Sequence, residues 1–358
     1  MNRLTAIGLA SLVAYGLLIA SKYTGMVSAA RSDKAAPATL FEGERAVAEV
    51  SSVNPEPRAQ PIFAPAPIAR SEPARASPNA IEFRSARDLK AFADALAARR
   101  AGLSGDERYH LAKALEECQF ATSINEDLAT YSTKQRRQFL ASLPAGDPLN
   151  AKRIAAYEAV DNTQRCLRFQ GTKISAKDVE ELYQGAAQQG DPRAQARLLV
   201  AELNKNLSNA NRADPSANAK VGNEDLSRLI GLLETRDPEA MMTVGQFLAQ
   251  SAIASQLRVG PNGEVPEPSA FLGAFSLVAC DLGPDCISLN REPQMACAYG
   301  GYCNAASFDE LYQNFLASPW AYAQAMRYRG LIYTAINTRN WALIGLLPPN
   351  SSPTQGPQ

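Results

Sequence analysis

The chain has 358 residues, and its 36 Lys and Arg side chains balance 36 Asp and Glu side chains. This balance argues against a nucleic-acid partner, because nucleic-acid-binding proteins concentrate basic residues on one face. A single histidine, His110, and six cysteines provide few candidate metal ligands, and no motif indicates a cofactor. Abundant Ala and Leu with few β-branched runs favour an all-α fold.

The N-terminal segment, residues 1–30, is predicted to direct export. Leu4–Ala20 is apolar or small throughout and follows Arg3. Two interpretations stay open: a signal peptide cleaved near Val27-Ser28-Ala29, or an uncleaved signal anchor with Arg3 on the cytoplasmic side. Either one places the rest of the chain in the periplasm, anchored to the inner membrane or secreted after signal cleavage.

Residues 31–80 are rich in Ala, Pro and Ser, with seven prolines from Pro55 to Pro78. Such a composition buries too little apolar surface to offset the entropy of the chain. We expect a disordered and partly stiff tether. A proline-rich ligand for another domain is the alternative interpretation.

An Asp-Pro step recurs within the helical-repeat body expected at residues 81–258. Its copies start at Asp147, Asp191 and Asp237, which are 44 and 46 residues apart. Asp is a strong N-cap, and Pro suits the first helical position because its missing N–H would be unpaired there in any case. Each step therefore predicts the end of one helix, a turn and the start of the next. A period in this range is typical of stacked helical hairpins.

Hydrophobic periodicity predicts the helices of this body. A long polar loop, rich in Asn, is expected at 204–224. The expected helices are Ser85–Gly102, Ser104–Cys118, Thr133–Leu143, Pro148–Cys166, one starting at Ser175, Asp191–Leu203, Glu224–Thr235 and Pro238–Ala254.

The stretch Leu182–Ala196 resembles the core of a Sel1-like repeat, a helical hairpin of the TPR type. In that family an Ala-Ala pair, here Ala186-Ala187, packs the first helix, and a Gly-Asp turn follows, here Gly190-Asp191. An Ala-Gln pair, here Ala194-Gln195, then opens the second helix. The resemblance implies a Sel1/TPR-like solenoid that binds other proteins and has no active site of its own.

Residues 259–303 form a cysteine-rich insert with an internal duplication. The pattern Ala-Cys-x-x-Gly-x-x-Cys occupies 279–286 and again 296–303. Each copy is expected to end a helix, Phe271–Leu282 in the first and Pro293–Tyr299 in the second, at a left-handed glycine.

The cysteines are expected to form disulfides. In each copy one Cys lies in the last helical turn and the other just beyond it, which predicts the pairs Cys280–Cys286 and Cys297–Cys303. Cys118 and Cys166 lie late on the second helices of adjacent units and are the expected third pair. A four-cysteine metal site is the alternative, but zinc sites favour about two to four residues between paired ligands, and an exported chain favours disulfides. The paired Cys-x5-Cys pattern after a helical body also resembles exported bacterial proteins of unknown function.

A final helical hairpin is expected at 304–347, with Ser318 as the cap of a second helix, Trp320–Leu343. Trp320 and Trp341 are expected to be buried as an end cap, with an anchor for a partner as the alternative. Residues 348–358 are expected to be a disordered tail.

The leading functional hypothesis is a scaffold or adaptor of the bacterial envelope, with a protein partner of unknown identity and no catalytic residues. The adjacent carboxylates Glu116-Glu117 and Glu180-Glu181 point about 100° apart on a helix, so they are expected on solvated faces rather than around one substrate. Arg193 and Arg197, four residues apart on one exposed helix face, are the candidate contacts for the partner. A cell-wall or polysaccharide-processing enzyme and a passive structural subunit are the alternatives.

Overall fold

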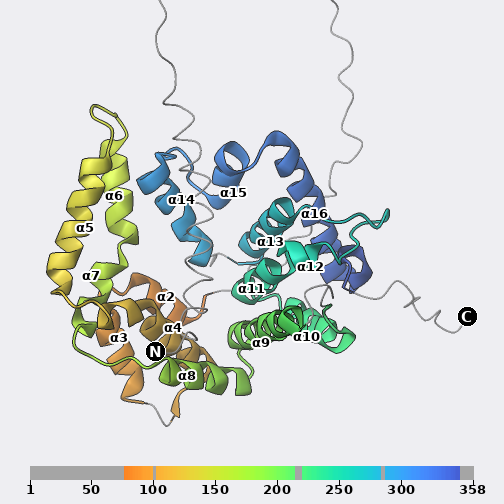
Figure 1. The fold of residues 1–358 in the computed structure, drawn as a ribbon, viewed down its shortest axis with the longest axis horizontal. Coiled ribbons are helices and arrows are strands. Elements are labelled where there is room, and N and C mark those ends of the chain that lie inside the picture. The colour runs from red at the N-terminus through yellow and green to blue at the C-terminus, as the bar shows by residue number, and fades with distance from the viewer. Residues whose placement is uncertain (1–75, 100–101, 214–219, 284–286, 347–358) are drawn as a thin grey trace, which may run out of the picture. The chain divides into compact units, whose positions relative to one another are not determined.

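The computed structural model describes residues 76–99, 102–213, 220–283 and 287–346, and their regular elements are helical (Figure 1). The predicted all-α class is therefore confirmed. Val259 and Glu264 form an isolated antiparallel bridge. The apolar segment Leu4–Ala20, most of the expected linker and the expected tail lie outside the described residues. Among the described helices, none is both long and apolar enough to cross a membrane.

The first three helices of the described residues each begin at a side chain that accepts free N–H groups of the first turn. The caps are Ser77, Asp88 and Ser104. The helices are α2 (Pro78–Ser85), α3 (Leu89–Ala97) and α4 (Gly105–Cys118). Helix α2 begins inside the segment expected to be linker, because Ser77 supplies a cap and Pro78 a first helical residue.

The next two helices, α5 (Leu128–Ser142) and α6 (Asn150–Val160), run side by side (Figure 1). The rings of Phe139 and Tyr157 stack between them, with 4.2 Å between the ring centroids. The single helix expected over Pro148–Cys166 is wrong. Asp161 ends α6, and its carboxylate accepts the Thr163 N–H to start a separate helix, α7 (Asn162–Cys166).

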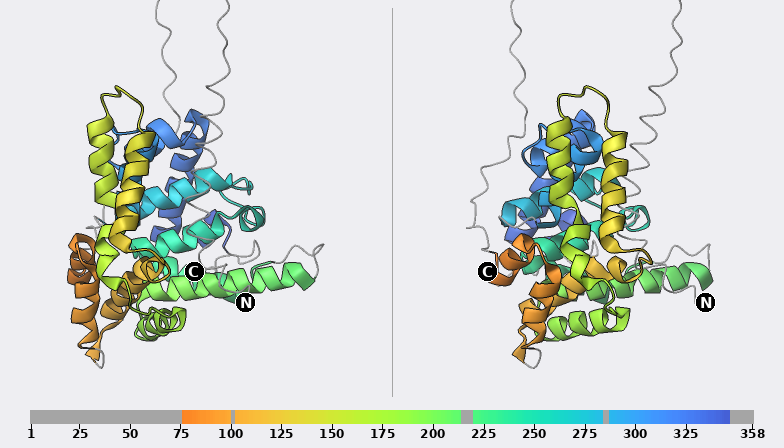
Figure 2. Two further views of the ribbon diagram at one scale, coloured as in Figure 1. Left: turned by 60° about the vertical axis from the view of Figure 1, so that its left-hand side comes forward. Right: turned by 90° about the vertical axis from the view of Figure 1, so that its left-hand side faces the viewer.

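Two further hairpins follow in the chain. The first pairs α8 (Ala176–Gln188) with α9 (Pro192–Ala213), and the second pairs α10 (Asn223–Glu234) with α11 (Pro238–Leu248). The loop expected at 204–224 is wrong over residues 204–213, because α9 continues to Ala213 as one long helix (Figure 2). Asn costs a helix only about 0.7 kcal/mol per residue. Leu203 and Leu207 continue the apolar stripe of α9 onto the main core, and their packing outweighs this local preference.

Each of the three Asp-Pro turns has a left-handed residue directly before the Asp. Glycine adopts this conformation without a Cβ clash, which makes it the usual residue after a helix end. The three residues and their φ angles are Gly146 (76°), Gly190 (85°) and Arg236 (56°). Asp191 and Asp237 then cap α9 and α11 with their carboxylates, as predicted. Asp147 lies in a turn instead, and α6 begins only at Asn150.

Two helices of the C-terminal half are shorter than predicted. The one expected over Pro238–Ala254 breaks after Leu248, and the one expected over Trp320–Leu343 ends at Thr338, because Arg339 is left-handed. The elements of this half are α12 (Ser251–Ala254), α13 (Pro268–Leu282), α14 (Ile287–Gly300), α15 (Phe308–Leu311), the π-helical turn η5 (Tyr312–Leu316), α16 (Pro319–Thr338) and the 3-10 turn η6 (Trp341–Ile344).

Helices pack on one another largely in chain order: α3 on α4, α4 on α8, α8 on α9, α9 on α11, α11 on α13 and α13 on α16. The contact of α14 with α6 is one of the long-range contacts that depart from this order (Figure 1). Arg153 of α6 donates to the carbonyl oxygens of Ala298 and Tyr299 at the end of α14. Hairpins that contact only their neighbours in a repeat array would not make this contact.

Two glycines allow close approach of elements in the main core. Gly245 of α11 lies against the Phe275 side chain of α13, and Gly273 of α13 lies against the Tyr312 ring of η5. A Cβ atom at either glycine would overlap the neighbouring ring, so these positions require the smallest residue.

Candidate functional site

Charged side chains from α4, α9 and α11 converge, and we name this group the α4–α9–α11 cluster. It includes both arginines expected to contact a partner. Its members are Asp106, Tyr109, His110, Lys113 and Glu116 of α4, Tyr183 of α8, the capping residue Asp191, Arg193 and Arg197 of α9, and Glu239 of α11.

Arg193 lies inside this cluster, with 12% of its side chain exposed. Its guanidinium donates to Asp106 at 2.7 Å and to Asp191 at 2.5 Å, and it lies 4.3 Å from the centre of the Tyr109 ring. Burial lowers the pKa of Arg193, but the two carboxylates more than offset this and raise it above its usual range. The expectation that Arg193 is exposed is therefore wrong, because a carboxylate from α4 binds it.

Arg197, one turn further along α9, keeps 42% of its side chain exposed. It forms an ion pair with Glu116, and its guanidinium lies 4.4 Å from the centre of the Tyr183 ring. The Tyr183 hydroxyl donates to the other oxygen of Glu116 at 2.9 Å. Arg197 therefore binds residues of its own chain, and its contact with a partner stays a prediction.

Glu239 of α11 accepts hydrogen bonds from two side chains of α4. Lys113 and Tyr109 both donate to its Oε1, Tyr109 at 2.6 Å. Burial alone would raise the pKa of Glu239, but the charge of Lys113 and these two hydrogen bonds lower it to about 2. Burial and the neighbouring Glu239 raise the pKa of Tyr109 well above its usual value. At neutral pH the ionised carboxylate and the neutral phenol therefore form a fixed link between α4 and α11.

Asp106 occupies the other end of the cluster. It accepts hydrogen bonds from Ser77, Asn79 and Arg193, and its Oδ1 lies 3.3 Å from Nδ1 of the buried His110. Burial would raise the pKa of Asp106, but hydrogen bonds with His110, Arg193 and Asn79 hold it well below its usual range. Asp106 therefore ties together the start of α2, α4 and α9.

The adjacent carboxylates Glu116 and Glu117 diverge, as helix geometry predicts, but neither lies on the expected solvated face. Glu116 binds Arg197, whereas Glu117 lies 2.8 Å from Arg165 of α7 and 3.4 Å from Arg291 of α14. The carboxylates of α4 therefore pair with cations from three other helices. This arrangement fits a structural ionic network that fixes the positions of the helices.

Two disulfides lie within the described residues, Cys118–Cys166 and Cys297–Cys303, and both are expected pairs. Cys280 is also disulfide-bonded, whereas its expected partner, Cys286, lies outside the described residues. The first bridge joins the ends of α4 and α7, and the second closes the end of α14.

The helix ends at these cysteines differ in part from the expectation. Gly301, rather than Gly300, is the left-handed residue after α14, and its N–H donates to the Cys297 carbonyl oxygen. Gly283 after α13 is extended, with φ of −152°, so a left-handed glycine is wrong there. Helix α14 also begins at Ile287, ahead of the expected Pro293.

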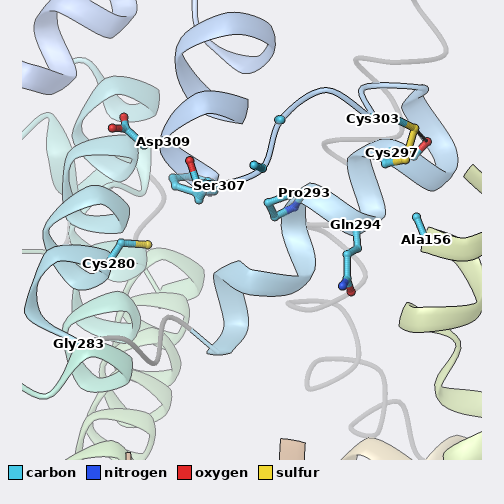
Figure 3. Close-up of a pocket in the computed structure, with 12 residues that line it drawn as sticks. Ala156, Cys280, Gly283, Pro293, Gln294, Cys297, Cys303, Ser307 and Asp309 are labelled. Atoms are coloured by element: carbon cyan, nitrogen blue, oxygen red, sulfur yellow. Dashed lines mark hydrogen bonds between the residues drawn. A yellow bond between two sulfur atoms is a disulfide. The ribbon is translucent and has the colours of Figure 1, made fainter. Parts of the chain in front are cut away.

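An open cavity of about 570 Å³ lies between α6, α13, α14 and α15, beside the Cys297–Cys303 disulfide (Figure 3). Two of its polar side chains already serve the neighbouring helices. The Ser307 hydroxyl accepts the Glu310 N–H and caps α15, and burial and the negative charge of Asp309 raise the pKa of Tyr322. The lining therefore points to no particular substrate class. Within the four described ranges, no group of three or more His, Cys, Asp and Glu side chains is placed to hold a metal ion.

The junction of η5 and α16 presents apolar side chains to solvent. Trp320 is 60% exposed, and Phe315 and Leu316 are 38% and 39% exposed. With the exposed Pro319, they form what we name the aromatic patch. The expected burial of Trp320 is wrong, whereas Trp341 is buried as expected.

The aromatic patch has a signal in the sequence that the hydrophobic periodicity does not show. Residues 311–326 contain no Asp, Glu, Lys or Arg. An uncharged stretch can belong either to the core or to an exposed apolar surface. Which residues of this stretch are buried depends on how α16 packs on α13.

No protein-family model, curated protein or solved structure gives a significant match to the chain. The resemblance of Leu182–Ala196 to a Sel1-like repeat therefore stays a prediction.

Proposed function

We propose that this protein is an exported scaffold of the bacterial envelope that binds another envelope protein. The observation that carries the proposal is the succession of packed helices from α3 to α16. Stacked helical hairpins bury their apolar faces against one another and leave an extended surface, which repeat proteins use for binding. In this proposal the hairpins are of the Sel1 type, and α8–α9 is the unit that fits the type best.

Export and attachment to the inner membrane through residues 1–30 are part of the proposal. The disulfides are compatible with an oxidising compartment. A reporter enzyme that is active only outside the cytoplasm, fused after Pro78, is expected to be active. Retention of the protein in washed membranes then distinguishes an anchor from a cleaved signal. An inactive reporter, together with an active cytoplasmic reporter at the same position, contradicts export.

Binding is tested by photo-crosslinking in cells. A photoreactive residue is placed at an exposed position on successive helices, Lys177 of α8, Gln195 of α9 or Gln246 of α11. Neighbouring positions are expected to give the same discrete product, and Thr130 on α5, outside the succession, serves as the matched control. If the purified protein instead hydrolyses an envelope polysaccharide, and substitution of one carboxylate abolishes this activity, then the protein is an enzyme and the scaffold proposal fails.

A further inference from the structure

The aromatic patch is held outward by the backbone around it. The Ala317 N–H donates to the Tyr312 carbonyl oxygen at 2.9 Å, which closes the π-helical turn. The Ser318 hydroxyl then accepts the Ala321 N–H at 3.2 Å and starts α16. Tyr312 faces inward and is buried, so the side chains of the same turn that follow it are left at the surface.

A partly buried tyrosine packs beside the patch. The rings of Tyr302 and Phe315 are stacked, with 4.8 Å between their centroids. Removing apolar surface from water is favourable in proportion to the area that is buried. Large apolar side chains left together in water are therefore characteristic of a surface that something else covers.

The charges around the patch restrict what can cover it. The nearest charged residues in the chain are Asp309 and Glu310 before it and Arg327 after it. Arg327 forms an ion pair with Glu264, and residues 311–326 contain no basic side chain that could attract anionic lipids or acidic proteins. An uncharged surface of Trp, Phe, Leu and Pro matches the boundary between the headgroups and acyl chains of a neutral lipid.

We infer that the aromatic patch contacts, through apolar side chains rather than through charge, the surface of the phospholipid bilayer that the N-terminal segment is proposed to enter. This inference rests on the proposed function, because the anchor is what brings a bilayer close. Between Ala20 and Ala76 lie 55 residues. A flexible chain of that length has an end-to-end distance of about 40 Å, and a stiff polyproline chain spans at most about 170 Å. Either length keeps the patch at a high local concentration of lipid, so even a weak apolar contact is enough for the patch to be bound to the bilayer much of the time.

The test uses the fluorescence of Trp320 in the full chain. The protein has two tryptophans, and Trp341 is buried, with 3% exposed. The chain is reconstituted into vesicles of phosphatidylcholine, either ordinary or brominated on the acyl chains. Brominated lipid is expected to lower the Trp320 emission at least twofold, and the effect should be the same at low and high salt. Trp320→Phe should remove the quenching and leave the emission of Trp341.

A second variant keeps the reporter and alters the patch. Phe315→Ser combined with Leu316→Ser should reduce the quenching of Trp320 at least twofold, with unchanged helicity by circular dichroism. Equal Trp320 emission in both kinds of vesicle, with full quenching by external iodide, overturns the inference. If Trp320 is instead shielded from iodide without lipid, and the shielding increases with protein concentration, then a second copy of the chain covers the patch. This result also overturns the inference.

Flotation of the vesicles reports separately on the anchor. If the chain does not float with the vesicles, the N-terminal segment does not anchor it. The patch is then tested by adding the same vesicles at high lipid concentration, and a lack of Trp320 quenching again overturns the lipid contact. Crosslinking to a protein partner is unaffected by that result, so failure of this inference and failure of the scaffold proposal are distinguishable.

Discussion

The guanidinium of Arg193 lies 4.3 Å from the centre of the Tyr109 ring, so a cation of α9 covers an aromatic ring of α4 while holding Asp106 and Asp191. Removing this cation leaves two largely buried carboxylates without their counter-charge. Breaking a buried ion pair from one side costs about 3–5 kcal/mol. Because Asp106 keeps 26% of its side chain exposed, we expect Arg193→Leu to lower the free energy of unfolding by about 3 kcal/mol, measured by urea denaturation.

The matched control for this substitution is Arg136→Leu. Arg136 and Glu158 form an ion pair in which both side chains are about half exposed. Surface pairs contribute about 0–1 kcal/mol. Equal losses for the two variants would show that Arg193 contributes no more than a surface charge.

The stability of the protein should fall in acid through Glu239. Its pKa is lowered from 4.5 to about 2 in the folded protein. The folded state therefore holds the ionised form more strongly than the unfolded chain does, and the resulting stability is complete above about pH 5 and lost as the pH falls toward about 2. We expect the melting temperature of Glu239→Gln to decline less steeply over this range than that of the wild type. Parallel curves for the two proteins would contradict the role of Lys113 and Tyr109.

The two described disulfides should differ in their contribution to stability. Cys118–Cys166 closes a loop with a sequence separation of 48, and Cys297–Cys303 one of 6. The loop-entropy relation gives about 4 kcal/mol for the first and about 2 kcal/mol for the second. Paired Cys→Ala variants, unfolded in urea without reductant, should show this order, and a larger loss at the short loop would exclude loop entropy as the main cause.

Gly245 and Gly231 should respond in opposite directions to the same substitution. A Cβ at Gly245 overlaps the Phe275 side chain, and overpacking a core costs about 1–3 kcal/mol. Gly231 of α10 is exposed and has no atom within 4 Å of the added carbon. There Ala is favoured over Gly by about 0.5–1 kcal/mol in a helix interior. We expect Gly245→Ala to lower the melting temperature and Gly231→Ala to raise it slightly.

The C-terminal part of α9 should be sensitive to proline. Asn209 is exposed and lies within this helix. Pro in a helix interior costs about 3 kcal/mol, whereas Ala favours the helix. Asn209→Pro is expected to speed amide hydrogen exchange over residues 205–213, and Asn209→Ala to slow it. If neither variant changes the exchange, these residues form a loop.

Features set by neighbouring residues in the chain could be predicted from the sequence. The turns at Asp191 and Asp237 depend on a capping Asp and the Pro that follows it, which are adjacent in the chain. The Cys297–Cys303 disulfide depends on a helix that ends between the two cysteines, which are six positions apart. Arg193 fails this condition, because its partner Asp106 lies 87 positions earlier and on another helix. A four-residue spacing places Arg193 and Arg197 on one face but cannot identify what covers that face.

The aromatic patch and the end of α9 illustrate two further limits. Local polarity predicts a loop over residues 204–213, but Leu203 and Leu207 find an apolar partner surface that only the tertiary fold supplies. Trp320 looks like a core residue by type, yet at the start of α16 it is 60% exposed. In both cases the outcome depends on which helix is the neighbour, and the local pattern of residues does not identify that neighbour.

The contact between α6 and α14 has a consequence for the order of folding during the proposed export. The stacked rings of Phe139 and Tyr157 meet the Tyr299 ring of α14, at 5.8 Å and 6.1 Å between centroids. In the proposed export the N-terminus crosses the membrane first, so α5 and α6 would emerge before α14, with the face that packs on α14 uncovered. Pairings between distant segments also form slowly, since a long loop must close first. Under this proposal, the uncovered face of α5 and α6 would be open to aggregation and proteolysis until Ile287 emerges, and a chaperone that acts at this stage would raise the yield.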